Sequence, residues 1–369
     1  MTPMPPNPPG VPPQTPSWPM GYPPPPPPQG GRGVSFFIAI FLGILLIASA
    51  GLNVLLLVLS VGSFASAGLG VDVEDQYFDE VYVAGQRSGE PRAAKVLQIT
   101  IRGAIAEDQN PVLGAAGGTV SQVRRGLRRA AADDVRGVLL YIDSPGGGVT
   151  DSDEIYELVR RFRSEHPDKR VLTLFGDIAA SGGYYVAVAS ERILARRTTI
   201  TGSIGVIMSA WNFTEAAKKL GVDQVAIKSE RTPYKDMLSM TRPMQPAERQ
   251  ILTDIVDELY DRFVTVVDDG RPGLDRAQVV AAANGAVYSA SKAKELGLVD
   301  DIGDHDTVVA WFGQQLGSPV TIVEQRRRAT LGQLLFGALQ QRAGPQGGID
   351  RLLTTSTGPR FLYYWEGAR

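Results

Sequence analysis

The chain has 369 residues, of which 43% are hydrophobic and 21% charged, so it is long enough to bury a full core and carry appended segments. Its formal net charge of -2 gives no electrostatic footprint for nucleic acid, and no nucleic-acid partner is expected. The absence of cysteine excludes disulfides, thiolate catalysis and cysteine-ligated metal, and leaves the redox compartment open.

A proline-rich head comes first. Residues Met1–Gly30 hold more than half of the chain's 26 prolines, including the unbroken run Pro23–Pro28. This segment has too few apolar residues for a core, so it is predicted to be disordered with polyproline II character. A cytoplasmic spacer is one interpretation. The other is a ligand for a proline-recognising partner, with Trp18 and Tyr22 as aromatic anchors.

An apolar segment follows the head. Gly33–Val71 contains no charged residue, and about 20 such residues span a bilayer. The triplet 65–67, Ala-Ser-Ala, is typical of a signal-peptide cleavage site, but the run is longer than the roughly 7 to 15 apolar residues of a secretory signal. The sequence therefore predicts a retained single-pass anchor. Arg32 before the span and Asp72 after it favour a cell (inner) membrane protein with a cytoplasmic N-terminus and an extracytoplasmic large domain.

From about Asp72 to Val323 the pattern is that of an α/β fold. Two successive units of strand, glycine-rich turn and helix place Gly146, Gly147 and Ser181 at equivalent ends of neighbouring strands. In open α/β sheets, functional sites form at that carboxyl edge. Strands are predicted over 96–105, 138–142, 171–175, 200–208 and 224–227, and helices over 121–132, 151–163, the residues after 181 to 188, 246–267 and 289–296.

The second of these turns contains a candidate nucleophile. Asp177–Tyr185 is a run of mostly small residues that puts Ser181, flanked by Gly182, at the start of a predicted helix. The first turn, Gly146–Gly148, offers backbone N–H groups that no side chain shields. Together they indicate a nucleophile facing an oxyanion hole. No Walker lysine follows the glycines, so neither a phosphate ligand nor another cofactor is expected.

A serine nucleophile needs a base. The two histidines, His166 and His305, have polar, turn-like neighbours and are expected to be solvent exposed, which disfavours a Ser-His-Asp triad. No Gly-x-Ser-x-Gly elbow or His-Glu-x-x-His helix is present either. Lys235 follows a predicted strand and has apolar and aromatic neighbours. Desolvation would let it accept the serine proton, and a surface lysine is the alternative.

Five motifs then occur in an order that resembles peptidase family S49, the signal peptide peptidase A family of membrane-anchored Ser-Lys proteases. The resemblance covers roughly 96–302 and leaves out the head and the tail. The motifs are Asp143-Ser-Pro-Gly-Gly-Gly, Ala179-Ala-Ser-Gly-Gly-Tyr-Tyr, Thr201-Gly-Ser-Ile-Gly-Val-Ile-Met, Tyr234-Lys-Asp and Val287-Tyr-Ser-Ala-Ser-Lys-Ala-Lys-Glu-Leu-Gly-Leu-Val-Asp.

The resemblance implies roles for individual residues. Ser181 matches the family's nucleophile and Lys235 its general base. Gly182 and one glycine of the pair Gly146 and Gly147, with Gly147 favoured, match the oxyanion hole. Ser203 matches a serine that hydrogen-bonds the catalytic lysine.

It also implies a fold, an assembly and a substrate. The expected fold is Clp protease/crotonase-like, with stacked ββα units. The chain has one set of motifs, so it resembles the short form, a homo-oligomer, expected to be octameric, in which adjacent subunits each contribute a dyad residue. The expected substrates are cleaved signal peptides or other apolar membrane-derived peptides. A general membrane-protein quality-control protease and a catalytically silent scaffold that recruits partners through the head are the alternatives.

The C-terminal end is apolar from Phe361 to Trp365. It is expected to pack against a neighbouring subunit, and occupation of the substrate groove is the alternative. The predicted domains are a disordered head (1–32), a transmembrane anchor (33–63), a linker (64–94), the protease domain (95–325) and a C-terminal tail (326–369).

Overall fold

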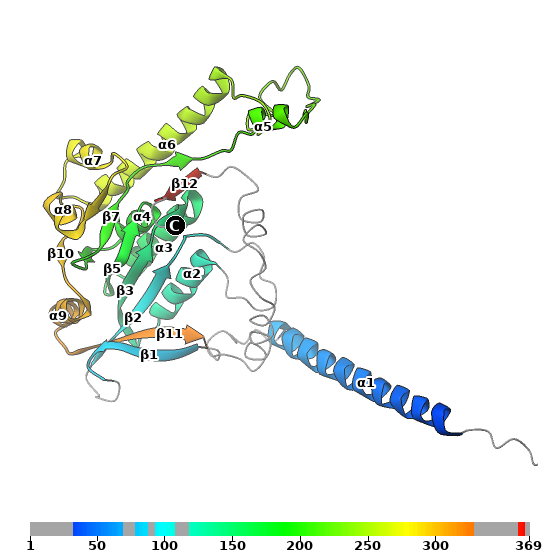
Figure 1. Cartoon of the computed structure of the whole chain (residues 1–369). Helices are drawn as coiled ribbons and strands as arrows, with labels where there is room; N and C mark the ends of the chain where they lie inside the picture. Colours follow the sequence, from blue (N-terminus) through cyan, green and yellow to red (C-terminus); the bar gives the residue numbers. More distant parts are fainter. Residues whose placement is uncertain (1–31, 69–77, 88–92, 108–117, 328–360, 366–369) are drawn as a thin grey trace, which may run out of the picture. The chain divides into compact units, whose positions relative to one another are not determined.

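The computed structural model describes residues 32–68, 78–87, 93–107, 118–327 and 361–365 (Figure 1). It divides into two compact units, 1–73 and 74–369, each described by itself. The first unit contains helix α1 (Arg32–Gly68), whose window Phe36–Val54 has a mean hydropathy of 2.4. Among the described residues this is the one helix long and apolar enough to cross a membrane. It covers the range predicted for the anchor.

Two sheets form the second unit. The described residues there contribute nine strands to the larger sheet and three to the smaller one. The larger sheet comprises β1 (Phe78–Gly85), β2 (Ala94–Arg102), β3 (Val135–Ser144), β5 (Arg170–Ala180), β6 (Arg192–Ala195), β7 (Ile200–Gly202), β9 (Val287–Ser289), β10 (Asp301–Ile302) and β11 (Val320–Arg327). The smaller sheet comprises β4 (Gly146–Gly148), β8 (Ile207–Met208) and β12 (Phe361–Tyr364).

The larger sheet has the order β1-β11-β2-β3-β5-β6-β10, and β2, β3, β5 and β6 run parallel. In β3, Val138, Leu139 and Leu140 are all fully buried. Because successive side chains of a strand point to opposite faces, this continuous burial means that both faces of the sheet are covered. The prediction of an α/β fold is confirmed.

Helices cover the two faces. The core on one face is lined by α2, α3 and α4, and the core on the other face contains Val308 and Phe312 of α9. The helix starts follow the sequence: Pro246 begins α6 behind a Gln245–Glu248 capping box. The helices of this unit are α2 (Thr119–Ala130), α3 (Val149–Glu165), α4 (Gly182–Ala187), α5 (Thr214–Lys219), α6 (Pro246–Gly270), α7 (Arg276–Ala282), α8 (Ala290–Glu295) and α9 (His305–Leu316).

Strand β5 changes its neighbour along its length, and this positions the candidate site. Its first half pairs with β6, whereas residues 178–180 pair with β7 in parallel. The register sets Ala180 opposite Gly202. The residues that follow these two positions, Ser181 and Ser203, therefore lie at the same edge of the sheet.

Three of the predicted segments differ from the structure. Residues 224–227 form no strand, and Val225 and Ile227 are 81% and 96% exposed. The predicted strand 200–208 is two short strands, β7 and β8, interrupted around Ser203. The range predicted to be linker contains β1, which pairs with β11 and extends the sheet.

Residues 209–245, between β8 and α6, form what we call the arm. Figure 1 shows α5 and the first turns of α6 projecting away from the sheet. The apolar alternation at 224–227 has no partner strand within the described part of the chain, so it forms no strand and its apolar side chains stay exposed.

Candidate active site

Ser181 lies in a sharp turn between β5 and α4. Its φ is 53° and its ψ is -116°, and Ser203 has a φ of 49°. Within the described part of the chain these are the two non-glycine residues with positive φ. Such backbone costs about 1–3 kcal/mol per residue and clusters at functional sites. The turn is fixed by hydrogen bonds from Ser181 N–H to Gly202 O, at 2.8 Å, and from Tyr185 N–H to Ser181 O, at 2.9 Å.

The small residues around Ser181 are required by close packing. A Cβ added to Gly182 would collide with the Ser152 hydroxyl, and one added to Gly183 would lie 3.0 Å from Ser144 O. Ser181 itself is only 1% exposed. Close packing therefore requires the small residues at Gly182 and Gly183, which the sequence predicts to lie beside a nucleophile.

The glycines of β4 lie against this turn. Gly146 has a φ of +100°, and a Cβ on it would lie 2.7 Å from Gly182 N. A Cβ on Gly182 would in turn lie 3.2 Å from Gly147 N. Gly147 bridges to Ile105, whose carbonyl leaves no space for a side chain. The backbones of Gly147 and Gly182 are thus brought close together, and neither position has space for a side chain.

A carbonyl oxygen of the C-terminal strand lies beside these glycines. Strand β12 pairs with β4 in antiparallel register, with Tyr363 opposite Gly147. Trp365 N–H donates to Pro145 O at 2.9 Å. Because hydrogen-bonded and non-hydrogen-bonded pairs alternate along an antiparallel ladder, Tyr363 and Gly147, two positions away, also form a hydrogen-bonded pair. The position of a Cβ on Gly182 is 3.1 Å from Tyr363 O. The Tyr363 carbonyl oxygen therefore lies next to both Gly147 and Gly182.

Ser203 lies beside the Ser181 turn, whereas Lys235 does not. Ser203 is 8% exposed, and its N–H donates to Ala286 O at 2.7 Å beside the Ser181 turn. Lys235 lies in the arm, where its N–H donates to Thr232 O at 3.2 Å and its side chain is exposed. Among the described residues, that side chain has no hydrogen-bond or ion-pair partner. The structure brings Ser181, Gly146, Gly147, Gly182 and Ser203 together, and leaves Lys235 on the arm.

The prediction that both histidines are exposed is wrong. His305 begins α9 and is half-buried, stacked on Tyr141 with 5.7 Å between ring centroids. Its Nε2 lies 2.9 Å from Gln98 Oε1 and its Nδ1 lies 3.3 Å from Arg196 Nη2. Burial lowers its pKa, and the Arg196 cation lowers it further. Because Arg196 can only donate, Nδ1 accepts and the ring is the neutral Nε2–H tautomer, held by structural contacts.

Other side chains that position the turn do not stand out in the sequence. The Asp143 carboxylate accepts from the N–H groups of Asp177 and Ile178, at 3.2 and 3.3 Å, and so ties the end of β3 to β5. Ser152 donates to Gly148 O at 2.8 Å. The aspartate at the start of the Asp-Ser-Pro-Gly-Gly-Gly motif is a signal that could have found the first of these contacts.

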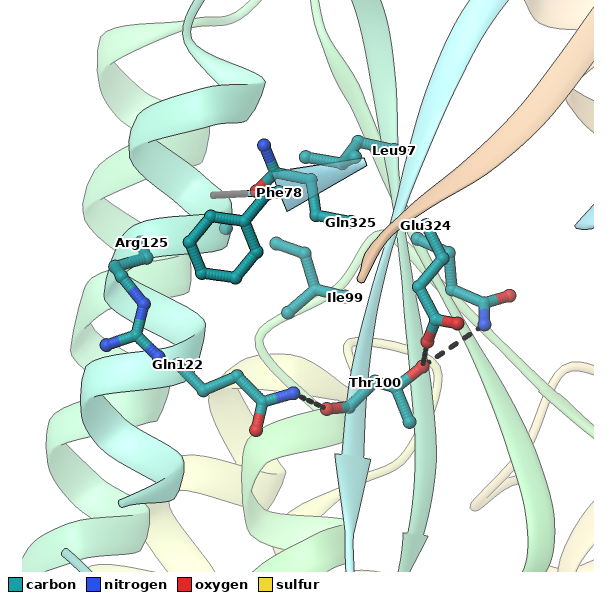
Figure 2. A pocket seen from close by; sticks show the side chains of 10 residues that line it. Phe78, Leu97, Ile99, Thr100, Gln122, Arg125, Glu324 and Gln325 are labelled. Atoms are coloured by element: carbon teal, nitrogen blue, oxygen red, sulfur yellow. Dashed lines mark hydrogen bonds between the residues drawn. The ribbon is translucent and has the colours of Figure 1, made fainter. Parts of the chain in front are cut away.

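A separate cavity of about 220 Å³ lies between α2 and strands β2 and β11 (Figure 2). Three of its polar residues are joined within the chain: Gln122 donates to Thr100 O at 2.8 Å, and the Thr100 hydroxyl donates to Glu324. The cavity contains none of the residues around Ser181. In the described part of the chain, no group of three or more His, Asp or Glu side chains is placed to hold a metal ion.

Comparison with known proteins supports the assignment of a peptidase. The model of Peptidase family S49 matches residues 163–318. The protein slr0021 of Synechocystis sp., named as an inferred protease, is 38% identical over 284 residues, which is 73% of this chain and 96% of that protein. An inferred signal peptide peptidase SppA of Enterococcus faecium is 34% identical over 243 residues, 63% of this chain and 69% of its own length.

Solved structures give weaker likenesses. A mutant of the 1510-N membrane-bound stomatin-specific protease has a TM-score of 0.39 at 14% identity, over 60% of this chain and 85% of that one. A mutant of ClpP1 from Listeria monocytogenes has a TM-score of 0.37 at 15% identity, over 56% and 91% of the two chains. The family assignment therefore rests on the sequence relatives and not on these structures. The chain belongs to peptidase family S49 and is a serine peptidase.

Proposed function

We propose that this serine peptidase is a membrane-anchored endopeptidase with Ser181 as nucleophile and Lys235 as general base. The observation that supports this best is the strained turn at Ser181, beside which the backbone of Gly147 and Gly182 lies next to the Tyr363 carbonyl oxygen. Two preorganised N–H donors at that point stabilise the negative charge that develops on a carbonyl under attack.

The proposed reaction has two steps. Neutral Lys235 takes the proton of Ser181 Oγ while that oxygen attacks the peptide carbonyl, and Gly147 and Gly182 hold the tetrahedral oxyanion. The lysine then gives the proton to the leaving amine, and water hydrolyses the acyl-enzyme. Ser203 would orient the lysine, because it lies beside Ser181 at the same sheet edge.

The base must come to the nucleophile from the arm. A lysine is neutral near pH 7 only where it is shielded from water, and Lys235 is exposed in a single chain. The arm also exposes large apolar side chains, among them Trp211 at 71%, Val225 at 81% and Ile227 at 96%. Exposed apolar surface of this kind is typical of an interaction site. We therefore propose that the arm docks on a second copy, in a ring that the family resemblance suggests is octameric, and that Lys235 completes the neighbour's site.

Mixing two inactive variants tests the shared site. If Ser181 and Lys235 come from different subunits, an equimolar assembly of Ser181→Ala and Lys235→Ala chains has both residues intact in about a quarter of its sites. Peptidase activity should return to about that fraction of wild type after dissociation and reassembly. The control is each variant taken alone through the same treatment. No recovery in an assembled mixture would refute the shared site.

A serine-reactive fluorophosphonate tests the dyad itself. Intact-protein mass spectrometry should find one adduct, on Ser181, in the wild-type chain. The adduct should be lost in Ser181→Ala, because the nucleophile is gone, and strongly reduced in Lys235→Ala, because the serine is no longer activated. Labelling of Ser181→Ala at the wild-type rate would remove Ser181 as the nucleophile.

The proposed substrates are apolar peptides derived from membrane proteins, including cleaved signal peptides. This follows from the apolar helix α1, which we propose anchors the chain with its N-terminus in the cytoplasm and its peptidase unit outside. It is consistent with the name of the Enterococcus faecium relative.

A further inference from the structure

A cavity of about 480 Å³ lies between the later part of α3 and the end of α6. Helix α3 contributes Tyr156, Arg160 and Arg163 to its lining, and α6 contributes Asp269 and Gly270. None of the residues around Ser181 lines it. Cavities of this size bind small molecules, which are oriented by a small number of polar groups. The polar groups of this cavity therefore indicate what it can hold.

Arg163 presents an unpaired edge of its guanidinium group. Its Nη1 donates to Ala189 O at 2.7 Å, in the turn after α4. Its Nε is buried and has no hydrogen-bond partner within the described ranges, and no hydrogen bond or ion pair there involves its Nη2. Nε and Nη2 share one edge, whose parallel N–H groups match the two oxygens of a carboxylate. Because a buried donor without an acceptor costs free energy, this edge indicates a bound oxyanion.

Tyr156 and Arg160 lie on the same face of α3 as Arg163, since the three occupy positions i, i+4 and i+7. Tyr156 is only 2% exposed, and among the residues that the structure describes its hydroxyl has no hydrogen-bond partner. The Arg160 guanidinium lies over the Tyr156 ring, 5.6 Å from its centroid. Burial raises the pKa of Tyr156 above its ordinary value, so the hydroxyl stays a neutral donor. The α3 side of the cavity is thus suited to a negative group.

Two carboxylates also line the cavity, and one of them is already paired. Glu191 forms an ion pair with Arg170 at 3.1 Å. Asp269 is exposed, and in the described part of the chain neither a hydrogen bond nor an ion pair holds its carboxylate. Both carboxylates would repel a dianion such as phosphate. An unpaired carboxylate and an unpaired guanidinium edge in one cavity instead match a ligand that has one negative and one positive group.

Packing brings the end of α6 toward Arg163. Gly270 is the last residue of α6, and a Cβ on it would lie 2.5 Å from Val188 O. Val188 directly precedes Ala189, whose carbonyl accepts from Arg163. The end of α6 and the Arg163 guanidinium therefore contact neighbouring peptide groups of one turn. Asp269 and Arg163 line the same cavity from these two sides without forming an ion pair with each other.

We propose that this cavity binds a free α-amino acid. The carboxylate of the ligand accepts from the Nε and Nη2 edge of Arg163, and its ammonium group pairs with Asp269. The cavity volume leaves space for a side chain. Free amino acids are end products of proteolysis, so the ligand is one that a peptidase meets. The site is separate from Ser181 and does not depend on the roles proposed for Ser181 and Lys235.

Three small molecules with nearly the same carbon chain test the proposal. L-norleucine has both charged groups, hexanoate lacks the ammonium group and n-pentylamine lacks the carboxylate. Isothermal titration calorimetry on the full-length chain in detergent gives each Kd, after the heat of each ligand into detergent alone is subtracted. Norleucine should bind about 10- to 100-fold more tightly than pentylamine, which cannot accept from Arg163. It should bind about 2- to 5-fold more tightly than hexanoate, which cannot pair with the exposed Asp269.

Three variants locate the binding. Arg163→Lys keeps the charge but loses the two-donor edge, and it should weaken norleucine binding about 10-fold. Asp269→Asn changes an exposed side chain, so we expect it to fold and to bind norleucine and hexanoate equally. Arg161→Gln is the matched control, because Arg161 is an exposed arginine of the same helix outside the cavity. It should leave all three Kd values unchanged.

Several results would overturn the proposal. Equal Kd values of wild type for norleucine and hexanoate would remove the pairing with Asp269, and tighter binding of inorganic phosphate would remove the amino-acid ligand. Norleucine binding that persists unchanged in both Arg163→Lys and Asp269→Asn would place the ligand elsewhere. A folded wild-type chain that does not bind norleucine would show that the Arg163 edge has no such ligand.

Discussion

Replacing Tyr363 with alanine should speed the reaction of Ser181 with a fluorophosphonate. In the structure β12 lies between β4 and β8, and its Tyr363 carbonyl oxygen lies next to Gly147 and Gly182, beside Ser181. The reagent reaches the serine only while the strand is away. The observed labelling rate is therefore the intrinsic rate multiplied by the fraction of time that the groove is empty.

The size of the effect follows from what Tyr363 buries. Truncating a buried aromatic side chain to alanine typically costs about 3–5 kcal/mol. The hydroxyl bond to Leu259 O contributes about 1 kcal/mol of such a loss. The docking equilibrium of the strand should therefore fall about 10²- to 10⁴-fold. The acceleration is limited by how rarely the strand leaves the site in wild type, so a strand docked about 90% of the time or more gives an acceleration of about 10-fold or more.

Three full-length variants in detergent separate the effect of the Tyr363 ring from that of its hydroxyl. Tyr363→Ala should be labelled fastest, and Tyr363→Phe, which keeps the ring and loses only the hydroxyl, about 2- to 10-fold faster than wild type. Tyr364→Ala is the matched control and should stay near the wild-type rate. Pseudo-first-order rates come from in-gel fluorescence at several reagent concentrations. Wild type and Tyr363→Ala reacting at the same rate would show that the strand does not guard the serine.

Three further predictions concern stability. Lys169, only 6% exposed, donates to Ala130, Ala131 and Ala132 carbonyls at 2.7–2.9 Å, so Lys169→Met should lower the free energy of unfolding in urea by about 2–4 kcal/mol. The pKa of His305 is lower in the folded chain than its ordinary value, so the unfolded chain takes up the proton first and the free energy of unfolding should fall as the pH drops below about 6.5. His305→Gln should remove that part of the pH dependence of the melting temperature. Arg242 donates to the buried carboxylate of Glu248 at 2.9 Å. Arg242→Ala should leave that carboxylate without its cation and loosen the arm, so that chymotrypsin cuts the arm faster. An unchanged cutting rate would refute the role of this ion pair in holding the arm.

The turns around Ser181 are predictable because their sequence signals are local. A glycine or alanine is needed wherever backbone approaches backbone, and the runs at 146–148 and 179–183 state that need directly. The buried strands β3 and β5 are predictable for a related reason, since a strand covered on both faces is apolar without interruption.

Features that depend on distant partners are harder to predict. The sequence predicts a linker where β1 lies, because the partner of this strand, β11, comes more than 200 residues later. It predicts an exposed His305 because the polar chain neighbours give no sign of Gln98 and Tyr141, which cover the ring from other strands. The predicted strand 224–227 has the right alternation but, among the described residues, no edge to pair with.

Ser181 lies in a formed turn and Lys235 is exposed on the arm, and this contrast also reflects whether the partners of each residue lie within the same chain. Ser181, Gly147 and Gly182 are held by strand pairing and close packing within one chain, so one chain is sufficient to form the proposed oxyanion site. The arm that bears Lys235 has its apolar residues in solvent, and an isolated chain gains nothing by ordering it against Ser181. If association covers those residues, the proposed base reaches Ser181 only on assembly, and we expect an unassembled subunit to have the proposed oxyanion site without an activated nucleophile.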